Sequence, residues 1–355
     1  MTYRVLMLGA SYGSLLASKM LLAGHSVSMV CLPAEAELMN EEGFRVRFPA
    51  RGNGEFLEVD SRRLPGILTT GGPQAFDPAG YDLVGLAMQE PQYRSPGVRE
   101  LLDAVAEAKT PCMSIMNMPP LTYLSRLPGV SASDHRHCYT DPTVWDGFDP
   151  AYLTLCSPDP QAFRPPDEKI NVLQVGLPTN FKAARFASDA HTAILRQLQA
   201  DIETARFDSG HGRVELPVKL KVHDSVFVPL AKWSMLVTGN YRCIRPNSVC
   251  SIKESVHADI DQSRSIYEWV ESLCSAMGAT AEDRVPFEKY ANAASSLGRP
   301  SSAARAVANG AQYIERVDRL VQSVASRKGM RSDALDEIVA TVDARIDANR
   351  RADPQ

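Results

Sequence analysis

Two segments of the sequence combine residue types that could carry chemistry. The first is Gly9-Ala10-Ser11-Tyr12-Gly13-Ser14, a turn that directly follows the apolar run at residues 3–8. Glycine at the start of a strand-to-helix turn lets a phosphate rest on the N–H groups of the helix start, where the helix dipole favours negative charge. The turn therefore predicts a phosphate-binding loop. Its candidate contacts are Gly9, Ser11, Tyr12 and Gly13.

The match of this turn to the dinucleotide pattern G-x-G-x-x-G is partial. Ser11 and Ser14 occupy the second and third glycine positions, and Gly13 comes one place early. A tight turn that binds nothing is the alternative. The position at the end of the first predicted strand favours the phosphate-binding interpretation.

The end of the second predicted strand bears on which dinucleotide such a loop would hold. Dinucleotide-binding folds place there an acidic residue for the ribose 2′-hydroxyl, or an arginine near a 2′-phosphate. Residues 31–35 read Cys-Leu-Pro-Ala-Glu, and we expect Glu35 to be a solvated residue at a helix start. Because no arginine follows nearby, the choice between NAD(H) and NADP(H) stays open, with a preference for NAD.

The second segment is the apolar run at residues 227–237, in which Lys232 is the one charged residue. Such a lysine either extends its ammonium group to the surface or is held at a cleft, where loss of water suits it to acid/base chemistry. Asn240 follows at i+8 on the same predicted helix. A third segment, residues 300–318, holds Ser301, Ser302 and Glu315, and on its own it indicates only a helix cap and an ion pair with Arg319.

The composition of the chain limits the classes of ligand that these segments could bind. The chain has 355 residues, with 38 Lys+Arg against 42 Asp+Glu, so its formal net charge is −4. No basic field exists to hold nucleic acid or an anionic membrane. The length favours two domains. Seven scattered cysteines without a CxxC pair indicate reduced thiols, and we expect a cytoplasmic protein without a signal peptide, a spanning helix or a metal site.

The elements that must position these residues follow from periodicity. Residues 3–8, a helix ending at Gly24 and residues 25–30 form a βαβ unit, which is how a doubly wound α/β sheet begins. Further strands are expected at 81–88, 111–116 and 170–177, with a helix at 98–108. Apolar residues recur at helical spacing over 256–277 and 304–324. We therefore expect a dinucleotide-binding domain at 1–185 with a Pro/aromatic-rich insertion or lid at 131–166, a helical substrate domain at 186–345 and a tail at 346–355.

The order of these features resembles that of the ketopantoate reductase (2-dehydropantoate 2-reductase) family. One similar segment is the family's D-hydrophobic-K-x-x-Q pattern, which resembles residues 82–92, Asp-Leu-Val-Gly-Leu-Ala-Met-Gln-Glu-Pro-Gln. Gln89 stands at the lysine position of this pattern, and Gln92 stands at its end. Residues 115–119 look like its I-x-N-G turn, which places Asn117. The resemblance covers most of the chain outside residues 131–166.

The second half of the chain continues the resemblance. Lys232 looks like the catalytic lysine of the family's W-x-K-L helix, with Asn240 at the i+8 place and Leu236 where an asparagine is usual. A P-N-G-like turn holds Asn247. The family's late serine and glutamate resemble Ser302 and Glu315. What the resemblance implies is a Rossmann-type doubly wound N-terminal domain followed by an all-helical C-terminal domain, similar to 6-phosphogluconate dehydrogenase.

The implied activity is NAD(P)H-dependent reduction of a 2-oxo acid, ketopantoate-like or larger, to a 2-hydroxy acid. Lys232 would stabilise the developing alkoxide and deliver the proton, and Glu315 would orient Lys232 or accept a substrate hydroxyl. Asn117 would fix cofactor and substrate geometry. The implied substrate contacts are Asn240, Asn247 and Ser302. The implied cofactor contacts are Gly9, Ser11, Tyr12, Gly13, Gln89, Gln92 and Asn117.

Three departures bear on the substrate: Gln89, Leu236 and Leu32 replace groups that the family uses, which favours a relative with a different oxo acid. An opine-type dehydrogenase is an alternative and would need a histidine followed by a carboxylate, for which His223-Asp224 is the one adjacent pair in the helical half. A dinucleotide-binding regulator without turnover is the second alternative. The oligomeric state is open, with a homodimer among the options.

Overall fold

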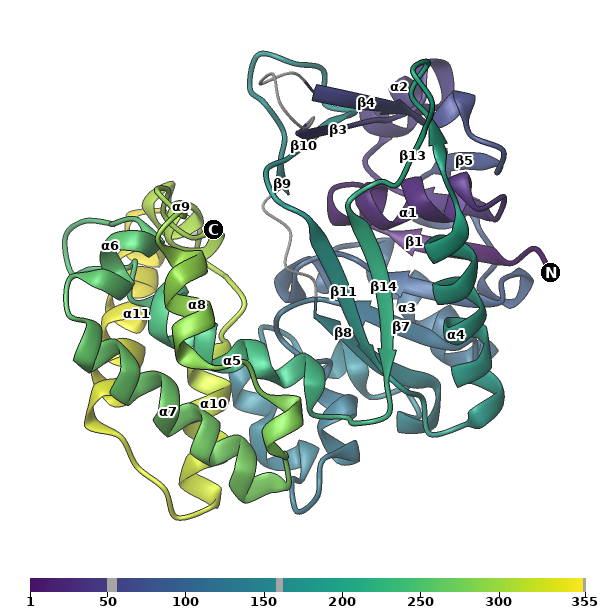
Figure 1. Ribbon diagram of the computed structural model, residues 1–355. Helices are drawn as coiled ribbons and strands as arrows, with labels where there is room; N and C mark the ends of the chain where they lie inside the picture. The colour runs from purple at the N-terminus through teal and green to yellow at the C-terminus, as the bar shows by residue number, and fades with distance from the viewer. Residues whose placement is uncertain (50–55, 158–161, 354–355) are drawn as a thin grey trace. The chain divides into compact units, whose positions relative to one another are not determined.

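The computed structural model describes residues 1–49, 56–157 and 162–353 (Figure 1). They form two compact units, between which the chain passes several times. The first unit comprises residues 1–88, 92–123 and 143–224, and the second comprises 89–91, 124–142 and the chain from 225 onward. The chain crosses from the first unit to the second for the last time at residues 224–225, whereas the sequence predicted the domain boundary at residue 186. The reason for the difference is that the helix Asp189–Thr204 and the strand Val218–His223, which follow residue 186, belong to the first unit.

An eight-stranded sheet forms the centre of the first unit, in the order β14-β11-β8-β7-β6-β1-β2-β5. The six strands from β8 to β5 are all parallel, in the Rossmann order, and β11 joins β8 antiparallel. This confirms the predicted fold class. The strands are β1 (Arg4–Leu8), β2 (Ser26–Val30), β5 (Leu68–Gly71), β6 (Leu83–Leu86), β7 (Cys112–Ile115), β8 (Leu153–Ser157), β11 (Thr179–Ala184) and β14 (Val218–His223).

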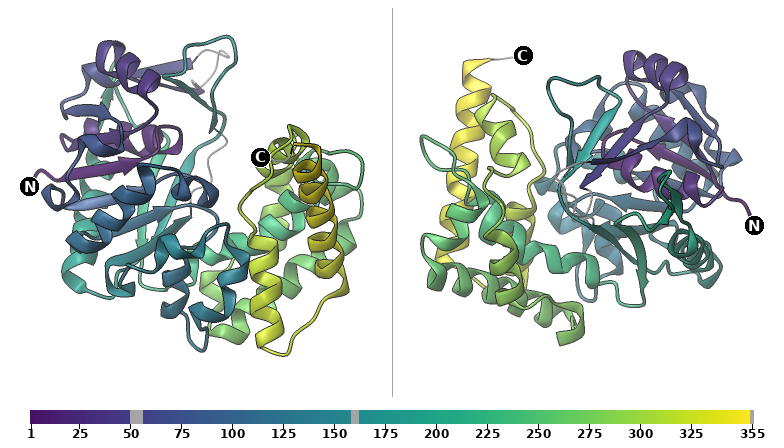
Figure 2. Two further views of the ribbon diagram at one scale, coloured as in Figure 1. Left: turned by 180° about the vertical axis from the view of Figure 1, so that it is seen from behind. Right: turned by 45° about the horizontal axis from the view of Figure 1, so that its top comes forward.

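The apolar composition of these strands explains their place. All four residues of β6 and of β7 are buried, as is usual for parallel strands covered on both faces. Helices α1 and α4 lie together on one face of the sheet (Figure 1), and α3 covers the other face (Figure 2). The helices of this unit are α1 (Tyr12–Leu22), α2 (Pro33–Glu42), α3 (Val98–Ala108) and α4 (Asp189–Thr204).

A second sheet, in the order β4-β3-β10-β9, packs beside the end of β2. Its inner side chains, among them Val46 and Leu173, share one core with Ala36 and Met39 of α2. The sequence predicted β10 but neither β3 nor β4. The strands are β3 (Arg45–Pro49), β4 (Phe56–Asp60), β9 (Ala162–Phe163) and β10 (Val172–Val175), and a separate hairpin joins β12 (Phe207–Asp208) to β13 (Arg213–Val214).

The predicted insertion at 131–166 divides between the two units. Its first part forms a 3-10 helix, η6 (Ala132–Cys138), that packs on α10 of the second unit. Its later part contains β8, whose five residues are all buried in the large sheet. The prediction of an insertion was therefore wrong for β8, because the flanking prolines concealed a short buried strand. Residues 158–161 of this stretch lie outside the described residues.

The second unit is built from helices, as predicted, although several differ in extent. Asp259 caps α7 through the N–H of Gln262, which separates α6 from α7. Gly310, with φ +89°, follows α9 and breaks the apolar pattern that predicted one helix over 304–324. The helices are α5 (Lys232–Met235), α6 (Ile252–His257), α7 (Ile260–Met277), α8 (Phe287–Ala294), α9 (Ser302–Ala308), α10 (Val317–Arg327) and α11 (Asp333–Ala352).

The predicted tail at 346–355 is mostly helical, since α11 continues to Ala352; residues 354–355 lie outside the described residues. Short 3-10 turns connect the elements of both units. They are η1 (Ser61–Arg63), η2 (Pro73–Ala75), η3 (Pro78–Gly80), η4 (Glu90–Arg94), η5 (Leu121–Arg126), η7 (Pro142–Trp145), η8 (Pro150–Tyr152), η9 (Val228–Ala231) and η11 (Ala281–Asp283). No helix in the described ranges is both long enough and apolar enough to cross a membrane.

Candidate active site

The Gly9 turn lies at the point where the order of the parallel sheet reverses. Strand β1 has β2 on one side and β6 on the other, and both pairings are parallel. Ligands of doubly wound sheets bind outside the carboxyl ends of the strands at this switch point. The structure therefore places the predicted loop where a dinucleotide-binding fold needs it.

The backbone at Gly9 requires glycine. Its φ is +106°, and a β-carbon there would lie 2.7 Å from the carbonyl oxygen of Ala87. The N–H of Gly9 donates to the carbonyl of Val30 over 3.0 Å, which links the turn to the end of β2. Ser11 occupies the N-cap of α1 without a side-chain capping bond, and the first turn carries no acidic residue. These features suit an anion at the start of α1.

The other two residues of the glycine pattern, Gly13 and Ser14, have structural roles in the packing and hydrogen bonding of α1. A β-carbon at Gly13 would lie 2.6 Å from Cγ of Met7, so this position needs glycine for the close contact of α1 with β1. The hydroxyl of Ser14 donates to the carbonyl of Ala10. The structure thus explains the serine at the third glycine position, since Ser14 bonds inside its own helix.

Asn117 follows β7, and Gln89 and Gln92 follow β6. Because β6 and β7 are parallel neighbours next to β1, the carboxyl ends of all three strands lie at the same edge as Gly9. Asn117 is half-buried there. Gln89 belongs to the short stretch 89–91 of the second unit. The roles assigned to these three residues stay predictions.

The end of β2 differs from the expectation for Glu35. The side chain of Glu35 is buried, accepts a hydrogen bond of 3.4 Å from the N–H of Leu32, and forms an ion pair with Arg164. Cys31 lies beside this pair: burial, and next to it the charge of Glu35, raises the pKa of its thiol to about 12, while Arg164 opposes the rise. The prediction of a solvated glutamate without an arginine nearby was therefore wrong. Arg164 was missed because it comes from a distant part of the chain.

Lys232 begins a helix of mixed geometry. The 3-10 turn η9 leads into the single α-turn α5, and a π-helix, η10 (Leu236–Tyr241), follows directly. Lys232 itself is half-buried, while Trp233 and Leu236 are buried. Short π-helical segments occur frequently at functional sites.

The π-helix changes the direction in which Asn240 lies. In an α-helix each residue turns the chain by about 100°, so a residue at i+8 lies about 80° away from residue i around the axis. Hydrogen bonds from i to i+5 add roughly one residue to each turn and reduce this rotation. The π segment therefore brings Asn240 back toward the side of Lys232. A regular helix would have kept the two apart.

Tyr290 of α8 supports this segment. Its hydroxyl donates to the carbonyl of Met235 over 3.1 Å, at the start of the π-helix. A β-carbon at Gly239 would lie 2.0 Å from the same hydroxyl oxygen. The hydroxyl of Ser255 adds a bond of 3.1 Å to the carbonyl of Gly239. The ring of Tyr290 stacks on Tyr267, with centroids 5.3 Å apart.

The π-helix also joins the late serine and glutamate segments. Ser301 donates its hydroxyl to the carbonyl of Asn240 over 2.7 Å and caps α9 through the N–H of Ala304. Ser302 is the first residue of α9 and is half-buried. The structure thus brings the segments of Lys232, Asn240 and Ser302 together in the second unit. Ser301, which makes this connection, was read from the sequence only as a cap.

Glu315 is held from the same helix. The hydroxyl of Tyr241 donates to the carbonyl of Glu315 over 2.6 Å and accepts the N–H of Val317 over 2.9 Å. Burial raises the pKa of Tyr241 well above its usual value, and the nearby charges of Asp318 and Glu315 add to this effect. The phenol therefore stays neutral and can serve both bonds at any ordinary pH.

The carboxylate of Glu315 is buried beside the stretch 89–91. It accepts the N–H of Glu90 over 3.3 Å. Glu90, itself buried, accepts the N–H and the hydroxyl of Thr140 over 2.9 and 2.8 Å. The sequence pointed to Glu315 and passed over Glu90, since a glutamate after a strand carries no signal of burial.

Asn247 lies apart from this arrangement. It is exposed in a turn that is bonded to α11, where Arg345 donates to the carbonyls of Arg245 and Ser248 over 2.6 and 3.0 Å. Its substrate contact stays a prediction.

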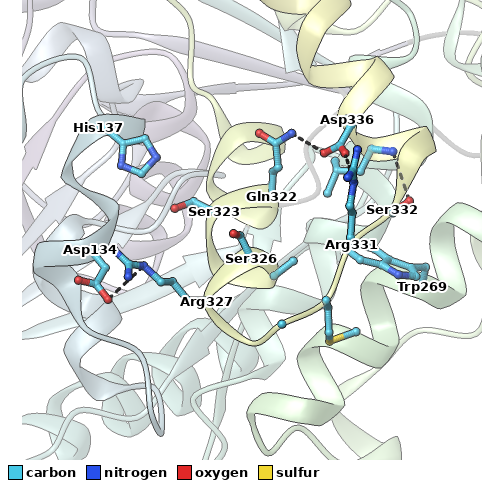
Figure 3. Close-up of a pocket in the computed structure, with 14 residues that line it drawn as sticks. Asp134, His137, Trp269, Gln322, Ser323, Ser326, Arg327, Arg331, Ser332 and Asp336 are labelled. Atoms are coloured by element: carbon cyan, nitrogen blue, oxygen red, sulfur yellow. Dashed lines mark hydrogen bonds and ion pairs between the residues drawn. The ribbon is translucent and has the colours of Figure 1, made fainter.

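A cavity of about 790 Å³ lies elsewhere in the second unit, between η6, α7, α10 and the start of α11 (Figure 3). Two of its arginines are neutralised by their neighbours, Arg327 by Asp134 and Arg331 by Asp336. The lining includes none of the residues predicted for catalysis or substrate binding. It is therefore separate from the candidate site.

Two residues from the histidine-containing segments that could suggest metal or opine chemistry have structural partners. His135 is buried and bonds Ser323 over 2.9 Å. Asp224, which follows His223, forms an exposed ion pair with Arg196. Over the described ranges, no group of three or more His, Cys, Asp or Glu side chains is arranged to hold a metal ion.

No protein-family model matches the sequence, and no curated protein matches it either. Solved structures match it over nearly its whole length. The ternary structure of D-mandelate dehydrogenase with NADH and anilino(oxo)acetate is 13% identical, covers 98% of this chain and 99% of that chain, and has a TM-score of 0.63. 2-Dehydropantoate 2-reductase from Methylococcus capsulatus is 12% identical, the match covers 98% of this chain and 97% of that chain, and the TM-score is 0.66. 2-Dehydropantoate 2-reductase from Geobacter metallireducens GS-15 is 13% identical, the match covers 96% of this chain and 99% of that chain, and the TM-score is 0.62. The chain therefore has the fold of the ketopantoate reductases and of D-mandelate dehydrogenase.

Proposed function

We propose that this protein is an NAD(P)H-dependent oxidoreductase that reduces a 2-oxo acid to a 2-hydroxy acid, with Lys232 as the general acid. The fold is shared with enzymes whose names describe this chemistry. The departures at Leu32, Gln89 and Leu236 favour an oxo acid other than ketopantoate.

The first unit has the features that a nicotinamide dinucleotide needs. Gly9 keeps the turn free of a side chain, and the first turn of α1 offers N–H donors without a competing carboxylate. A pyrophosphate fits this set of donors. The bound nicotinamide would supply the hydride. Ser11, Tyr12 and Gly13 would hold the phosphates, and Asn117 would lie toward the reacting end of the cofactor.

The second unit would provide the proton and the substrate contacts. The ammonium group of Lys232 would hydrogen-bond the keto oxygen of the substrate, stabilise negative charge there and deliver a proton. Asn240 would hold a polar group of the substrate on the same side. Ser302 would be a further contact for the substrate carboxylate, and the contact predicted for Asn247 would have to come from its separate, exposed turn. Glu315 would orient the lysine.

The observation that carries this proposal is the π-helix η10. Its geometry would turn Asn240 toward the side of Lys232; it bonds to Ser301, next to Ser302, and holds the backbone of Glu315 through Tyr241. This helix contains Asn240, begins four residues after Lys232, and bonds to the segments that hold Ser302 and Glu315. Short π-helical segments are rare, and they occur frequently at functional sites.

The experiment has two steps on the same preparation. The affinities for NADPH and NADH are measured first by calorimetry. The loss of absorbance at 340 nm is then followed with a panel of 2-oxo acids, from pyruvate through branched aliphatic acids to phenylglyoxylate. We expect dinucleotide binding and turnover with at least one acid on the panel.

Three results would argue against the proposal in different ways. Binding of neither dinucleotide would exclude the reductase. Binding without turnover on any acid would favour a dinucleotide-binding regulator. Turnover that also needs an amine would indicate opine chemistry instead.

A further inference from the structure

Two buried cysteines of the second unit, Cys243 and Cys250, lie opposite each other directly after the π-helix. Both carry free thiols in the structure. We propose that this pair is a modification site, at which a hydroperoxide forms an intramolecular disulfide bond between Cys243 and Cys250. The inference goes beyond the proposed function and does not depend on it, because the oxidation needs neither cofactor nor substrate.

The first observation is the backbone pairing of residues 243–250. Ile244 and Val249 form an antiparallel bridge, and the N–H of Cys250 donates to the carbonyl of Cys243 over 3.0 Å. The two cysteines are therefore directly opposite, with their side chains on one face of the pairing. The α-carbons of such a pair lie about 5.5 Å apart, within the roughly 4.4–6.8 Å that a disulfide spans. A disulfide bond thus requires rotation of the side chains and no new backbone pairing.

The second observation is the place of the two sulfur atoms. The thiol of Cys243 donates to the carbonyl of Gly239 over 3.2 Å, and that of Cys250 donates to the carbonyl of Arg242 over 3.8 Å. Both thiols thus lie over the same helix end. Burial raises the pKa of each thiol, and a hydrogen bond between the two side chains adds to the rise for Cys243 and opposes it for Cys250.

The turn between the two cysteines is held from outside. Arg345 of α11 donates to the carbonyls of Arg245 and Ser248 over 2.6 and 3.0 Å. The residue after the second cysteine, Ser251, caps the start of α6 with its hydroxyl. Because the backbone is fixed on both sides of the pair, the thiols stay opposite each other.

Cys250 is the thiol that meets the oxidant first. It is 5% exposed, whereas Cys243 is 0% exposed. The guanidinium of Arg245 opposes the rise that burial causes in the pKa of Cys250. The side chain of Arg245 is 43% exposed and forms an ion pair with Glu254 over 2.9 Å, so this side of the pair faces solvent. A cation beside a thiol favours the thiolate, which is the reacting form.

The chemistry takes two steps. The thiolate of Cys250 attacks one peroxide oxygen, so an S–O bond forms, the O–O bond breaks, and the leaving oxygen takes up a proton as water. The sulfur of Cys243 then attacks the sulfenic acid on Cys250: the S–S bond forms, the S–O bond breaks, and a second water leaves with the Cys243 proton. Two thiols are oxidised and one peroxide is reduced to two waters. The product ties the end of the π-helix to the start of α6.

The test counts thiols and weighs one peptide. The wild-type protein, Cys243→Ala and Cys250→Ala are treated with hydrogen peroxide, and the remaining thiols are titrated after unfolding. Trypsin cleaves after Arg242 and Lys253 and does not cleave before Pro246, so the single peptide 243–253 contains both cysteines. Its mass is measured before and after treatment, and again after reduction with dithiothreitol.

Cys274→Ala is the matched control. Cys274 is 6% exposed in α7 of the same unit, so its burial is close to that of Cys250. The charges that act on its thiol belong to Glu271 and Arg284 rather than to a second cysteine. The control therefore separates the effect of a facing thiol from that of a buried thiol in general.

We expect the thiol count of the wild-type protein to fall by two from its initial seven, and the peptide 243–253 to lose two hydrogen atoms. Dithiothreitol should restore both thiols. Cys274→Ala should lose the same pair. Cys243→Ala should stop at a sulfenic acid on Cys250, which dimedone traps, and Cys250→Ala should keep Cys243 reduced.

The wild-type peptide decides the outcome, so the test holds even where a variant misfolds. A peptide of unchanged mass, or one that gains oxygen without losing hydrogen, would overturn the inference. Loss of the same number of thiols in Cys243→Ala as in the wild type would also overturn it. None of these results bears on the proposed reductase, which is tested separately by dinucleotide binding.

Discussion

The hydroxyl oxygen of Tyr290 lies 2.0 Å from the place that a β-carbon would take at Gly239, and it donates to the carbonyl of Met235 over 3.1 Å. Residue 239 therefore has to be glycine for the tyrosine to reach the backbone of the helix. The two residues together hold the π-helix that relates Asn240 to Lys232. Neither of them is predicted to contact the substrate.

Gly239→Ala should destabilise the protein because its methyl group overlaps the hydroxyl of Tyr290. We expect a loss of about 1–3 kcal/mol in the free energy of unfolding, the range for overpacked sites. Urea unfolding of Gly239→Ala, Tyr290→Phe and the double variant measures the coupling. The alanine should cost less in the Tyr290→Phe background, where the hydroxyl is gone. Simple additivity of the two single changes would contradict this account.

Tyr241→Phe removes a hydroxyl that serves two buried backbone groups. It leaves the N–H of Val317 and the carbonyl of Glu315 without this partner. We expect a loss of about 1–3 kcal/mol in unfolding free energy and a lower kcat, since Glu315 is no longer held. Unfolding by urea and steady-state kinetics check the two effects. A variant as stable and as active as the wild type would show that the hydroxyl holds nothing.

Gly9→Ala should weaken dinucleotide binding. The substitution forces a side chain into a backbone with φ +106° and into contact with the carbonyl of Ala87, 2.7 Å away. Gly24→Ala is a matched control, because Gly24 has φ +87° and no atom within 4 Å of its β-carbon position. Both variants should lose about 1–2 kcal/mol of stability from backbone strain. Only Gly9→Ala should weaken NADPH binding, by about tenfold or more in calorimetry. Equal affinity in the two variants would remove the loop from the site.

The buried side chain of Lys19 predicts how the stability of the protein depends on pH. It is 1% exposed in α1, and burial lowers its pKa to about 8, an effect that Glu215 opposes. The unfolded chain keeps this proton up to its usual pKa of 10.5, so it binds more protons than the folded protein between pH 8 and 10.5. The contribution of Lys19 to stability is present above pH 10.5 and is lost as the pH falls through 8.

Lys19→Met should therefore raise the free energy of unfolding at pH 7 by on the order of 2 kcal/mol. It should also reduce the rise in stability between pH 8 and 10. Thermal unfolding of the wild type and the variant across this pH range measures both effects. A destabilised Lys19→Met protein at pH 7 would mean that the ammonium group has a favourable partner.

The sequence was sufficient for those parts of the fold that depend on neighbours in the chain. The first βαβ unit follows from one apolar run, one glycine turn and one largely apolar helix that ends at a glycine, all within residues 3–30. Helix α3 was predicted with its observed bounds, because its apolar stripe is regular. In contrast, β8 is a short strand between prolines and aromatic residues, and only its neighbours in the sheet explain it.

The parts of the candidate site that were missed depend on distant residues. Arg164 reaches Glu35 because the small sheet folds back onto α2, which no local pattern indicates. The π-helix cannot be read from residues 236–241, since its cause includes a tyrosine on another helix. Lys232 and Glu315 were singled out from the sequence, and the resemblance supplied their roles. The structure adds that Tyr241 holds the backbone of Glu315 and that the N–H of Glu90 donates to its carboxylate.

The central claim is that Lys232 delivers the proton, and it is tested by kinetics at saturating NADPH with the best 2-oxo acid. Lys232→Ala and Lys232→Met are compared with Lys253→Ala, an exposed lysine on α6 of the same unit. We expect kcat to fall by about 10²- to 10⁴-fold in both Lys232 variants, the usual contribution of a general acid, while the affinity for NADPH stays within about threefold. Lys253→Ala should behave as the wild type. Turnover in Lys232→Met at a rate near that of the wild type would contradict the account.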